Sequence, residues 1–159
     1  MSKLVLFALF VSGTCALNPE NLSAAENVAE AKQKPAKLEL IKVKSSLDDS
    51  LQPSMFWAPA SAKTTPTPLF VFLHSWSGNY KQNNAKWLQE AEQRGWIYLH
   101  PDFRGVNQQP EACGSRLARQ DILDAIEYVI KHYNVDQSRI YLAGSSGGGH
   151  MTMLMAGHH

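Results

Sequence analysis

The stretch that decides the fold is Ile140-Tyr-Leu-Ala-Gly-Ser-Ser-Gly-Gly-Gly149, an apolar run that stops abruptly in a cluster of serines and glycines. Residues 140–143 have the composition of a buried parallel strand, and the mainly apolar residues 150–156 favour a helix. The stretch therefore predicts a strand, a tight turn and a helix in immediate succession.

The predicted turn contains Gly144-Ser-Ser146-Gly-Gly148, which fits the pattern G-x-S-x-G with Ser146 at its centre. A strand that turns at once into a helix strains the backbone of the central residue, and side chains two positions to either side would collide. The turn exposes the serine oxygen and directs the first helical N–H groups at whatever that oxygen attacks. In this context the pattern predicts a nucleophile at Ser146; a structural glycine-rich turn is the alternative.

Strands and helices alternate along the chain before this stretch. Alternating apolar residues in 37–44 and the apolar segment 51–59 predict an antiparallel hairpin, with 60–68 as a connecting loop. Buried-type strands are expected at 69–74 and 96–100, and residues 134–138 should turn the chain into the strand at 140.

Two helices are expected between these strands. One is capped by Asn83 or Asn84, stops at Gly95 and carries Trp87 on its core face, and the other starts at Ser115. Strands of this type in alternation with helices predict an α/β fold, in which helices cover both faces of a mainly parallel sheet.

Composition excludes some partners and suggests a compartment. The chain has 159 residues, 44% hydrophobic and 18% charged, with a net charge of +1, so neither nucleic acid nor an anionic membrane surface is indicated. Residues 1–16 fit a signal peptide cleaved after Ala16, and residues 17–36 fit a mobile leader. We expect export to the periplasm or outside the cell. Lipid anchoring at Cys15 is a weaker alternative because Thr14 makes a poor lipobox.

Cys113 would then be the remaining cysteine of an exported chain. In an oxidising compartment a single thiol suggests a disulfide partner outside this sequence, although a lone buried thiol is an equal alternative.

The order of elements, together with the segments "PDFRG" at 101–105 and "AGSSGGGHM" at 143–151, resembles the α/β-hydrolase fold and, within it, the prolyl-oligopeptidase-type serine hydrolases. The resemblance extends over roughly 38–159. It implies an esterase or a serine-type peptidase, acting on a small ester or a peptide without a cofactor or metal.

The resemblance also implies roles for particular residues. Ser146 would be the nucleophile, and the backbone N–H of Gly147 would be one donor of the oxyanion hole. The second donor would come from the loop after His74. A glycine often follows this histidine in the family, whereas Ser75 stands there in this sequence. We expect the N–H of Trp76 to be the donor, with that of Ser75 as the alternative.

The end of the sequence departs from the family pattern. In this fold the catalytic acid and then the histidine base follow the serine along the chain, and residues 147–159 contain His150, His158 and His159 but no carboxylate. His150 follows Ser146 by one helical turn and would point parallel to it rather than toward it. We therefore expect residues 37–159 to be the N-terminal part of a hydrolase domain, with acid and base elsewhere in the parent protein, and these 159 residues alone to be inactive.

Other polar residues have structural interpretations. His74 and His100 end buried-type strands and are expected to be structural hydrogen-bonding residues. Asp102 and Arg104 are expected to tie their loop together by a salt bridge.

Two functions from different classes remain. The first is an exported serine hydrolase that acts on an ester, or alternatively a peptide, through an acyl-enzyme at Ser146. The second is a catalytically inactive hydrolase-like domain with a binding or structural role. Substrate and oligomeric state are left open.

Overall fold

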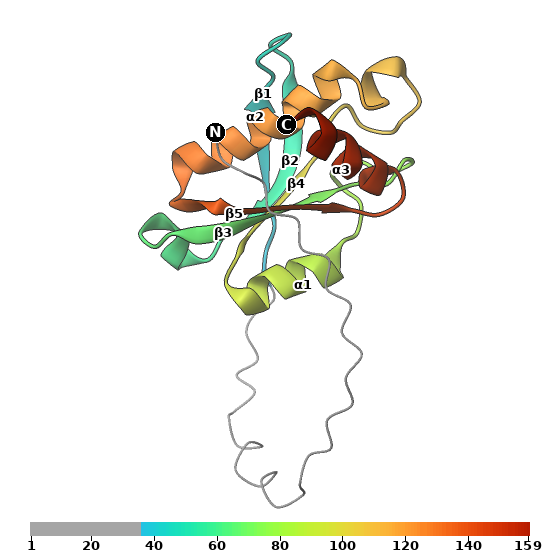
Figure 1. Ribbon diagram of the computed structural model, residues 1–159. Coiled ribbons are helices and arrows are strands. Elements are labelled where there is room, and N and C mark those ends of the chain that lie inside the picture. The colour runs from blue at the N-terminus through green and yellow to red at the C-terminus, as the bar shows by residue number, and fades with distance from the viewer. Residues whose placement is uncertain (1–35) are drawn as a thin grey trace, which may run out of the picture. The chain divides into compact units, whose positions relative to one another are not determined.

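The computed structural model describes residues 36–159. The proposed signal peptide (1–16) and all but Ala36 of the proposed leader (17–36) lie outside the described residues. In the described part, five strands form one sheet with helices on both faces (Figure 1). The strands are β1 (Glu39–Lys44), β2 (Leu51–Trp57), β3 (Thr67–Leu73), β4 (Ile97–Pro101) and β5 (Val135–Gly144). The helices are α1 (Ala85–Arg94), α2 (Arg116–His132) and α3 (Gly147–His158), with short 3₁₀ turns η2 (Ala60–Lys63) and η3 (Pro110–Ala112).

The predicted hairpin is confirmed. β1 and β2 pair antiparallel, with Glu39 opposite Phe56 and Lys44 opposite Leu51. The turn between them uses Asp49 in the left-handed region (φ 62°), a conformation that aspartate tolerates better than most residues. The hairpin adds to the rest of the sheet through β2, which pairs antiparallel with β4.

The sheet is mixed, and its strand order is β1-β2-β4-β3-β5. β3 lies between β4 and β5 and is parallel to both. Leu69, Val71 and Leu73 of β3 are fully buried, which matches the continuous apolar pattern of a strand covered on both faces. Because the three strands are parallel, their carboxyl ends meet at one edge of the sheet, and the loops that follow His74, Pro101 and Gly144 come together there.

The prediction of a turn at 134–138 was wrong, because β5 already begins at Val135. Thr67 of β3 pairs with Val135, whereas Leu69, two residues on, pairs with Ile140. The residues between bulge out of the ladder, and the Asp136 carboxylate accepts the N–H of Ser138 at 3.0 Å. The turn-forming residues thus make a bulge inside the strand rather than a separate turn.

The helices cover the two faces of the sheet as expected. α2 and α3 lie on one face, and α1 lies on the other (Figure 1). The larger core packs residues of α2 and α3 against β3 and β4: Leu69, Val71, Leu73, Ile97, Leu99, Ala118, Ile122, Ala125, Val129, Met151 and Met155. The smaller core under α1 contains Phe72, Ala91 and Tyr98. In residues 36–159 no helix combines the length and apolar character that crossing a bilayer requires.

The ends of two helices behave as the sequence indicates. The Ser115 hydroxyl accepts the N–H of Ala118 at 3.0 Å at the start of α2, a typical N-cap. Gly95 ends α1 with φ 64°. Trp87 on α1 stacks on Phe72, with ring centroids 5.3 Å apart, yet it remains 40% exposed. It therefore covers the core from outside rather than filling it.

Candidate active site

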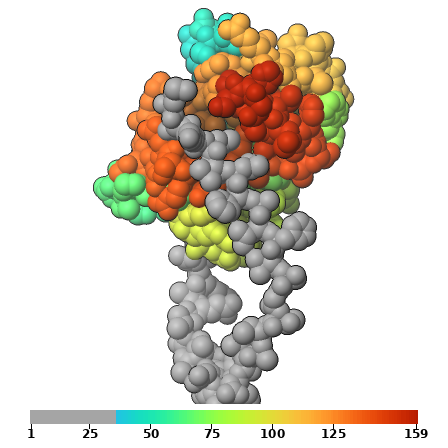
Figure 2. All heavy atoms as spheres, viewed as in Figure 1, coloured from blue at the N-terminus to red at the C-terminus, as the bar shows by residue number. Residues whose placement is uncertain are grey.

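Ser146 occupies the sharp turn between β5 and α3. Its backbone has φ 54° and ψ −118°, a combination that costs a residue with a side chain on the order of 1–3 kcal/mol and is concentrated at functional sites. Its side chain is exposed, and within residues 36–159 Ser146 Oγ makes no hydrogen bond. In the space-filling view α3 lies at the molecular surface, beside the loop that precedes α2 (Figure 2).

The glycines of the motif are required by close backbone packing. A Cβ on Gly144 would overlap the backbone of Gly148, and a Cβ on Gly148 would overlap the carbonyl oxygens of Leu73 and His74. The first turn of α3 therefore lies directly against the end of β5 and the end of β3. Only residues without a side chain allow this approach, which positions the start of α3 beside Ser146.

Gly147 brings a second segment to Ser146. A Cβ on Gly147 would lie 2.5 Å from the backbone nitrogen of Trp76, so the two backbones are in contact. The Gly147 N–H is at the first position of α3 and has no acceptor within the helix. The Trp76 N–H donates no hydrogen bond to any other residue of the described part. Two backbone donors that make no hydrogen bond within residues 36–159 therefore lie next to each other and next to Ser146.

The neighbouring Ser75 N–H is engaged. It donates to Gln82 Oε1 at 2.8 Å, and the Ser75 hydroxyl donates to the same oxygen at 2.9 Å. Of the two donors that the sequence leaves open, Trp76 is the one whose N–H makes no hydrogen bond in the part of the chain that the structure describes.

The Ser75–Trp76 peptide is held through its carbonyl. The Ser75 oxygen accepts from His74 Nδ1 at 3.0 Å and from the Gly78 N–H at 2.9 Å. Because the peptide is planar and trans, fixing this C=O also fixes the direction of the Trp76 N–H. The Trp76 carbonyl in turn accepts the N–H of Asn107 at 2.9 Å.

His74 joins this loop to the turn after β4. It is 2% exposed, its Nε2 lies 2.6 Å from the Asp102 carbonyl oxygen, and its ring stacks on Phe103 at 3.8 Å. Both ring nitrogens therefore face backbone carbonyl oxygens, that of Ser75 and that of Asp102. The expectation that His74 is structural agrees with this geometry.

The Asp102 side chain makes a further connection between the two loops. Its Oδ1 accepts the N–H of Tyr80 at 3.0 Å. Burial raises the pKa of Asp102, opposed by the Tyr80 N–H and the charge of His74. Asp102 thus supports the loop that carries Trp76 through its backbone and its side chain.

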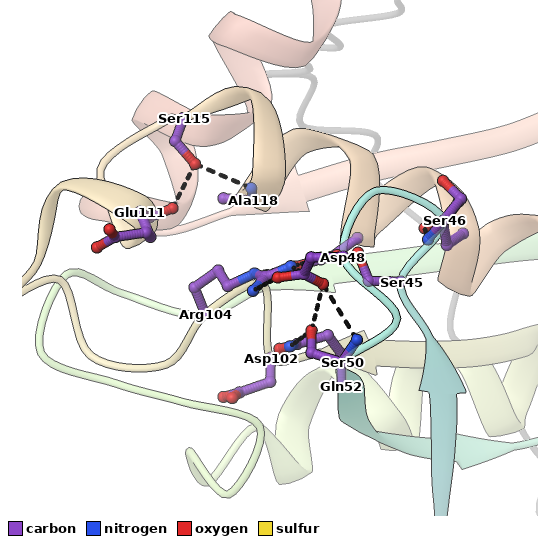
Figure 3. A network of polar contacts seen from close by, with 12 residues as sticks. Ser45, Ser46, Asp48, Ser50, Gln52, Asp102, Arg104, Glu111, Ser115 and Ala118 are labelled. Atoms are coloured by element: carbon purple, nitrogen blue, oxygen red, sulfur yellow. Dashed lines mark hydrogen bonds and ion pairs between the residues drawn. The ribbon is translucent and has the colours of Figure 1, made fainter.

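The predicted salt bridge between Asp102 and Arg104 was wrong, because Arg104 has other partners. Arg104 pairs with Asp121 on α2 at 2.5 Å and with Asp48 in the β1–β2 turn at 2.7 Å, and not with Asp102. Its Nη2 also donates to Ser45 Oγ at 3.2 Å. Figure 3 shows the Arg104 side chain lying against Asp48 and Ser45.

Burial differs between the two carboxylates. The Asp121 side chain is 1% exposed and that of Asp48 is 36% exposed. Hydrogen bonding to Arg104 holds the pKa of Asp48 far below its usual range, and the two carboxylates, Asp48 first, raise the pKa of Arg104. This network holds the backbone at Phe103 and Arg104, both at positive φ (29° and 79°).

His100 is a buried neutral histidine. Burial, followed by the charge of His74, lowers the pKa of His100 to about 3. Asn84 Nδ2 lies 3.2 Å from its ring nitrogens, and its ring centroid is 6.3 Å from that of His74. His100 therefore packs and hydrogen-bonds, as the sequence suggested.

The described residues bring no base to the serine. The His150 N–H donates to the Ser146 carbonyl at 3.1 Å, and the centroid of the His150 ring lies 6.1 Å from that of the Trp76 ring. His158 and His159 are exposed at the other end of α3. No histidine or carboxylate of residues 36–159 hydrogen-bonds to Ser146 Oγ.

Space beside the two free donors is small. A cavity of about 10 Å³ is lined by Trp76, Gly147 and His150 among others, and this is room for roughly one water molecule. Cys113, in the nearby loop before α2, is exposed and forms no disulfide within the part of the chain that the structure covers. The same part contains no group of three or more His, Cys, Asp or Glu residues placed to hold a metal ion.

A mixed sheet whose strands β3, β4 and β5 are parallel, helices on both faces and a strained serine between strand and helix are the features of the α/β-hydrolase class. Residues 56–159 match the BD-FAE family, so more than half of the chain is covered and the chain belongs to this family. The resemblance to prolyl-oligopeptidase-type α/β-hydrolases is confirmed.

Curated relatives are esterases. The chain is 31% identical over 112 residues to feruloyl esterase B of Neurospora crassa, covering 63% of this chain and 37% of that protein. It is 31% identical over 88 residues to the bifunctional acetylxylan esterase/xylanase XynS20E of Neocallimastix patriciarum, covering 54% of this chain and 13% of that protein.

Solved structures confirm the fold. The acylaminoacyl peptidase of Pyrococcus horikoshii superposes with a TM-score of 0.62 at 25% identity over 77% of this chain and 21% of its own. Esterase Est22 superposes with a TM-score of 0.58 at 23% identity over 75% of this chain and 38% of its own. The chain thus corresponds to part of these larger proteins.

Proposed function

We propose that this chain carries the nucleophile and the oxyanion hole of a serine hydrolase that cleaves carboxylic esters through an acyl-enzyme at Ser146. The observation that carries the proposal is the strained, exposed Ser146 beside the free N–H groups of Gly147 and Trp76. A glycine-rich structural turn needs neither a serine at positive φ nor two unpaired donors next to it.

The chemistry follows from this arrangement. Ser146 Oγ attacks the ester carbonyl carbon and gives its proton to a general base, while the carbonyl oxygen becomes an oxyanion that accepts from Gly147 and Trp76. Each such donor contributes on the order of 3 kcal/mol to stabilising the transition state. The alcohol leaves with the proton from the base, and water then attacks the acyl group on Ser146 and releases the acid.

The proposal needs a histidine base and a carboxylate that orients it. The described residues supply neither to Ser146, so in this proposal both come from outside residues 36–159. The 159-residue chain by itself is then expected to be inactive.

The names of the relatives support an ester as the substrate. Two similar proteins are named acetylxylan esterase or feruloyl esterase, which favours an acetyl or aromatic acyl ester of a carbohydrate hydroxyl over a peptide. The structural neighbour named acylaminoacyl peptidase keeps peptide cleavage as the alternative. Export, with cleavage of a signal peptide after Ala16, is part of the proposal, and N-terminal sequencing of secreted protein that begins at Leu17 would support it.

The test of the nucleophile uses the full-length protein and a fluorophosphonate probe. Wild type should be labelled and should hydrolyse p-nitrophenyl acetate, and Ser146→Ala should lose both, with a fall in kcat of about 10⁴-fold or more. Ser145→Ala is the matched control because Ser145 is the exposed neighbour in the same turn, and it should keep labelling. A folded wild type without labelling or turnover would favour an inactive binding domain.

A further inference from the structure

Gln82 occupies a central place in the loop that carries Trp76. Its carboxamide oxygen accepts both the N–H and the hydroxyl of Ser75, at 2.8 and 2.9 Å. Its carboxamide nitrogen donates to Asn84 Oδ1 at 3.1 Å, and Asn84 in turn contacts the buried His100. The side chain of Gln82 thus links Ser75 to the end of β4.

Gly78 leaves the space for this carboxamide. A Cβ on Gly78 would overlap Gln82 Oε1, and it would lie 3.3 Å from the Ser75 carbonyl oxygen. The backbone of Gly78 has φ outside the left-handed region, because it is not among the glycines at positive φ. The requirement for glycine here is therefore space for the Gln82 carboxamide and not a special backbone conformation.

The consequence for the oxyanion hole follows from peptide geometry. Two peptide planes meet at Ser75. Gln82 holds the first through the Ser75 N–H, and His74 and Gly78 hold the second through the Ser75 carbonyl. Holding both planes leaves Ser75 no backbone freedom, so the Trp76 N–H keeps one direction beside Gly147.

We propose that Gln82 is a positioning residue that withdraws the Ser75 N–H from the site and fixes the Trp76 N–H as the second oxyanion donor. This inference rests on the proposed function. A donor that is misplaced is expected to weaken transition-state binding more than substrate binding, since the oxyanion exists only during the reaction.

The first experiment replaces the carboxamide in the full-length protein. Gln82→Met keeps the length of the side chain but removes the acceptor for Ser75. With p-nitrophenyl acetate, kcat should fall about 10- to 100-fold while KM changes less than about threefold, which is less than the loss of a whole donor. Asn83→Ala is the matched control in the same loop, because the Asn83 side chain accepts only from the N–H of Ala85, and its kcat should be unchanged.

The second experiment disrupts the contact between Gln82 and Ser75 by a change at Gly78. Gly78→Ala should displace the carboxamide and lower kcat in the same way, and the double variant with Gln82→Met should be no slower than Gln82→Met alone, because both changes remove one interaction. If Gln82→Met does not fold, two other variants test the role of Gln82. They are Gly78→Ala, and Gln82→Glu, which keeps an acceptor oxygen for Ser75. Gln82→Glu should then retain more kcat than Gly78→Ala.

The outcomes separate the two proposals. If Ser146→Ala abolishes activity but Gln82→Met and Gly78→Ala keep kcat within about twofold of wild type, Gln82 does not position the donor and only this inference fails. A selective rise in KM would also overturn it, because that pattern marks uniform substrate binding. If Ser146→Ala remains active, the proposed function fails first and the role of Gln82 fails with it.

Discussion

Two turns at the carboxyl edge of the sheet have side-chain-bearing residues at positive φ, and they are held in different ways. The turn after β5 contains Ser146 (φ 54°) and is held by the close contact of glycine backbones. The turn after β4 contains Phe103 and Arg104 and is held by an ion pair to buried Asp121. Close steric packing holds the conformation of the first turn, whereas an ion pair holds that of the second. An added methyl group should therefore disrupt the first turn, and the loss of a charge should disrupt the second.

The largest expected effect is a methyl group in the turn after β5. Gly148→Ala would push Cβ into the carbonyl oxygens at the end of β3, and backbone on both sides cannot yield as a flexible side chain would. We expect ester hydrolysis to fall at least about 100-fold and the free energy of unfolding to drop by about 2 kcal/mol, measured by kinetics and urea unfolding.

Gly157→Ala is the control on the same helix. A Cβ there meets nothing within 4 Å, and alanine in a helix is favoured over glycine by up to about 1 kcal/mol. Equal effects of the two changes would mean that close packing does not hold this turn.

The next effect concerns the turn after β4. Asp121→Ala leaves the guanidinium of Arg104, whose side chain is 13% exposed, without its buried partner. We expect a loss of about 3 kcal/mol in unfolding free energy, measured by urea unfolding at neutral pH. Glu127→Ala on the same helix breaks only an exposed pair with Lys131 and should change stability by less than about 0.5 kcal/mol. A small effect of Asp121→Ala would show that charge does not hold this turn.

Acid should destabilise the end of β4, where His100 is buried. The pKa of His100 falls from 6.5 to about 3 on folding, so between these values the unfolded chain binds a proton that the folded chain does not. The contribution of His100 is complete above pH 6.5 and is lost as pH falls toward 3, with a slope approaching about 1.4 kcal/mol per pH unit. His100→Leu should flatten this part of the stability profile. An unchanged profile would assign the acid sensitivity to other groups.

The smallest effect is expected at the exposed end of the Arg104 network. Asp48→Asn removes an ion pair at the surface, and it should lower the melting temperature far less than Asp121→Ala does. Most of the difference from wild type should vanish in 1 M salt, which screens exposed charges. If Asp48→Asn lowered the melting temperature as much as Asp121→Ala does, and independently of salt, the exposed partner of Arg104 would contribute as much stability as the buried one.

How much could be predicted from sequence depends on how local each interaction is. The turn at Ser146 was predictable because Gly144, Ser146 and Gly148 are close in the chain. Their spacing alone indicates where a side chain would collide with the backbone. The hairpin and the cap at Ser115 were predictable for the same reason. The bulge before Ile140 was not, because it depends on which residue of β3 pairs with Val135.

In the candidate site, too, contacts between residues close in sequence were predictable and contacts between remote residues were not. Ser146 and Gly147 could be proposed from the motif. The free N–H of Trp76 could only be suggested together with that of Ser75, because the choice depends on a contact with Gln82 across a turn. The partner of Arg104 was missed because Asp121 lies on a helix, and a one-turn pattern of Asp121 and Asp124 resembles a solvated helix face.

The contact between Gly147 and Trp76 has a consequence for folding experiments. The two amides belong to segments that are remote in sequence, and they become neighbours only when β5 has paired with β3. A partly folded chain that lacks this one strand pairing would retain β3, β4 and much of its helix, yet the Trp76 N–H would not lie beside Gly147. Under the proposed function, recovery of catalysis by the full-length protein after denaturation therefore requires β5 to dock on β3, whereas circular dichroism follows the formation of helices.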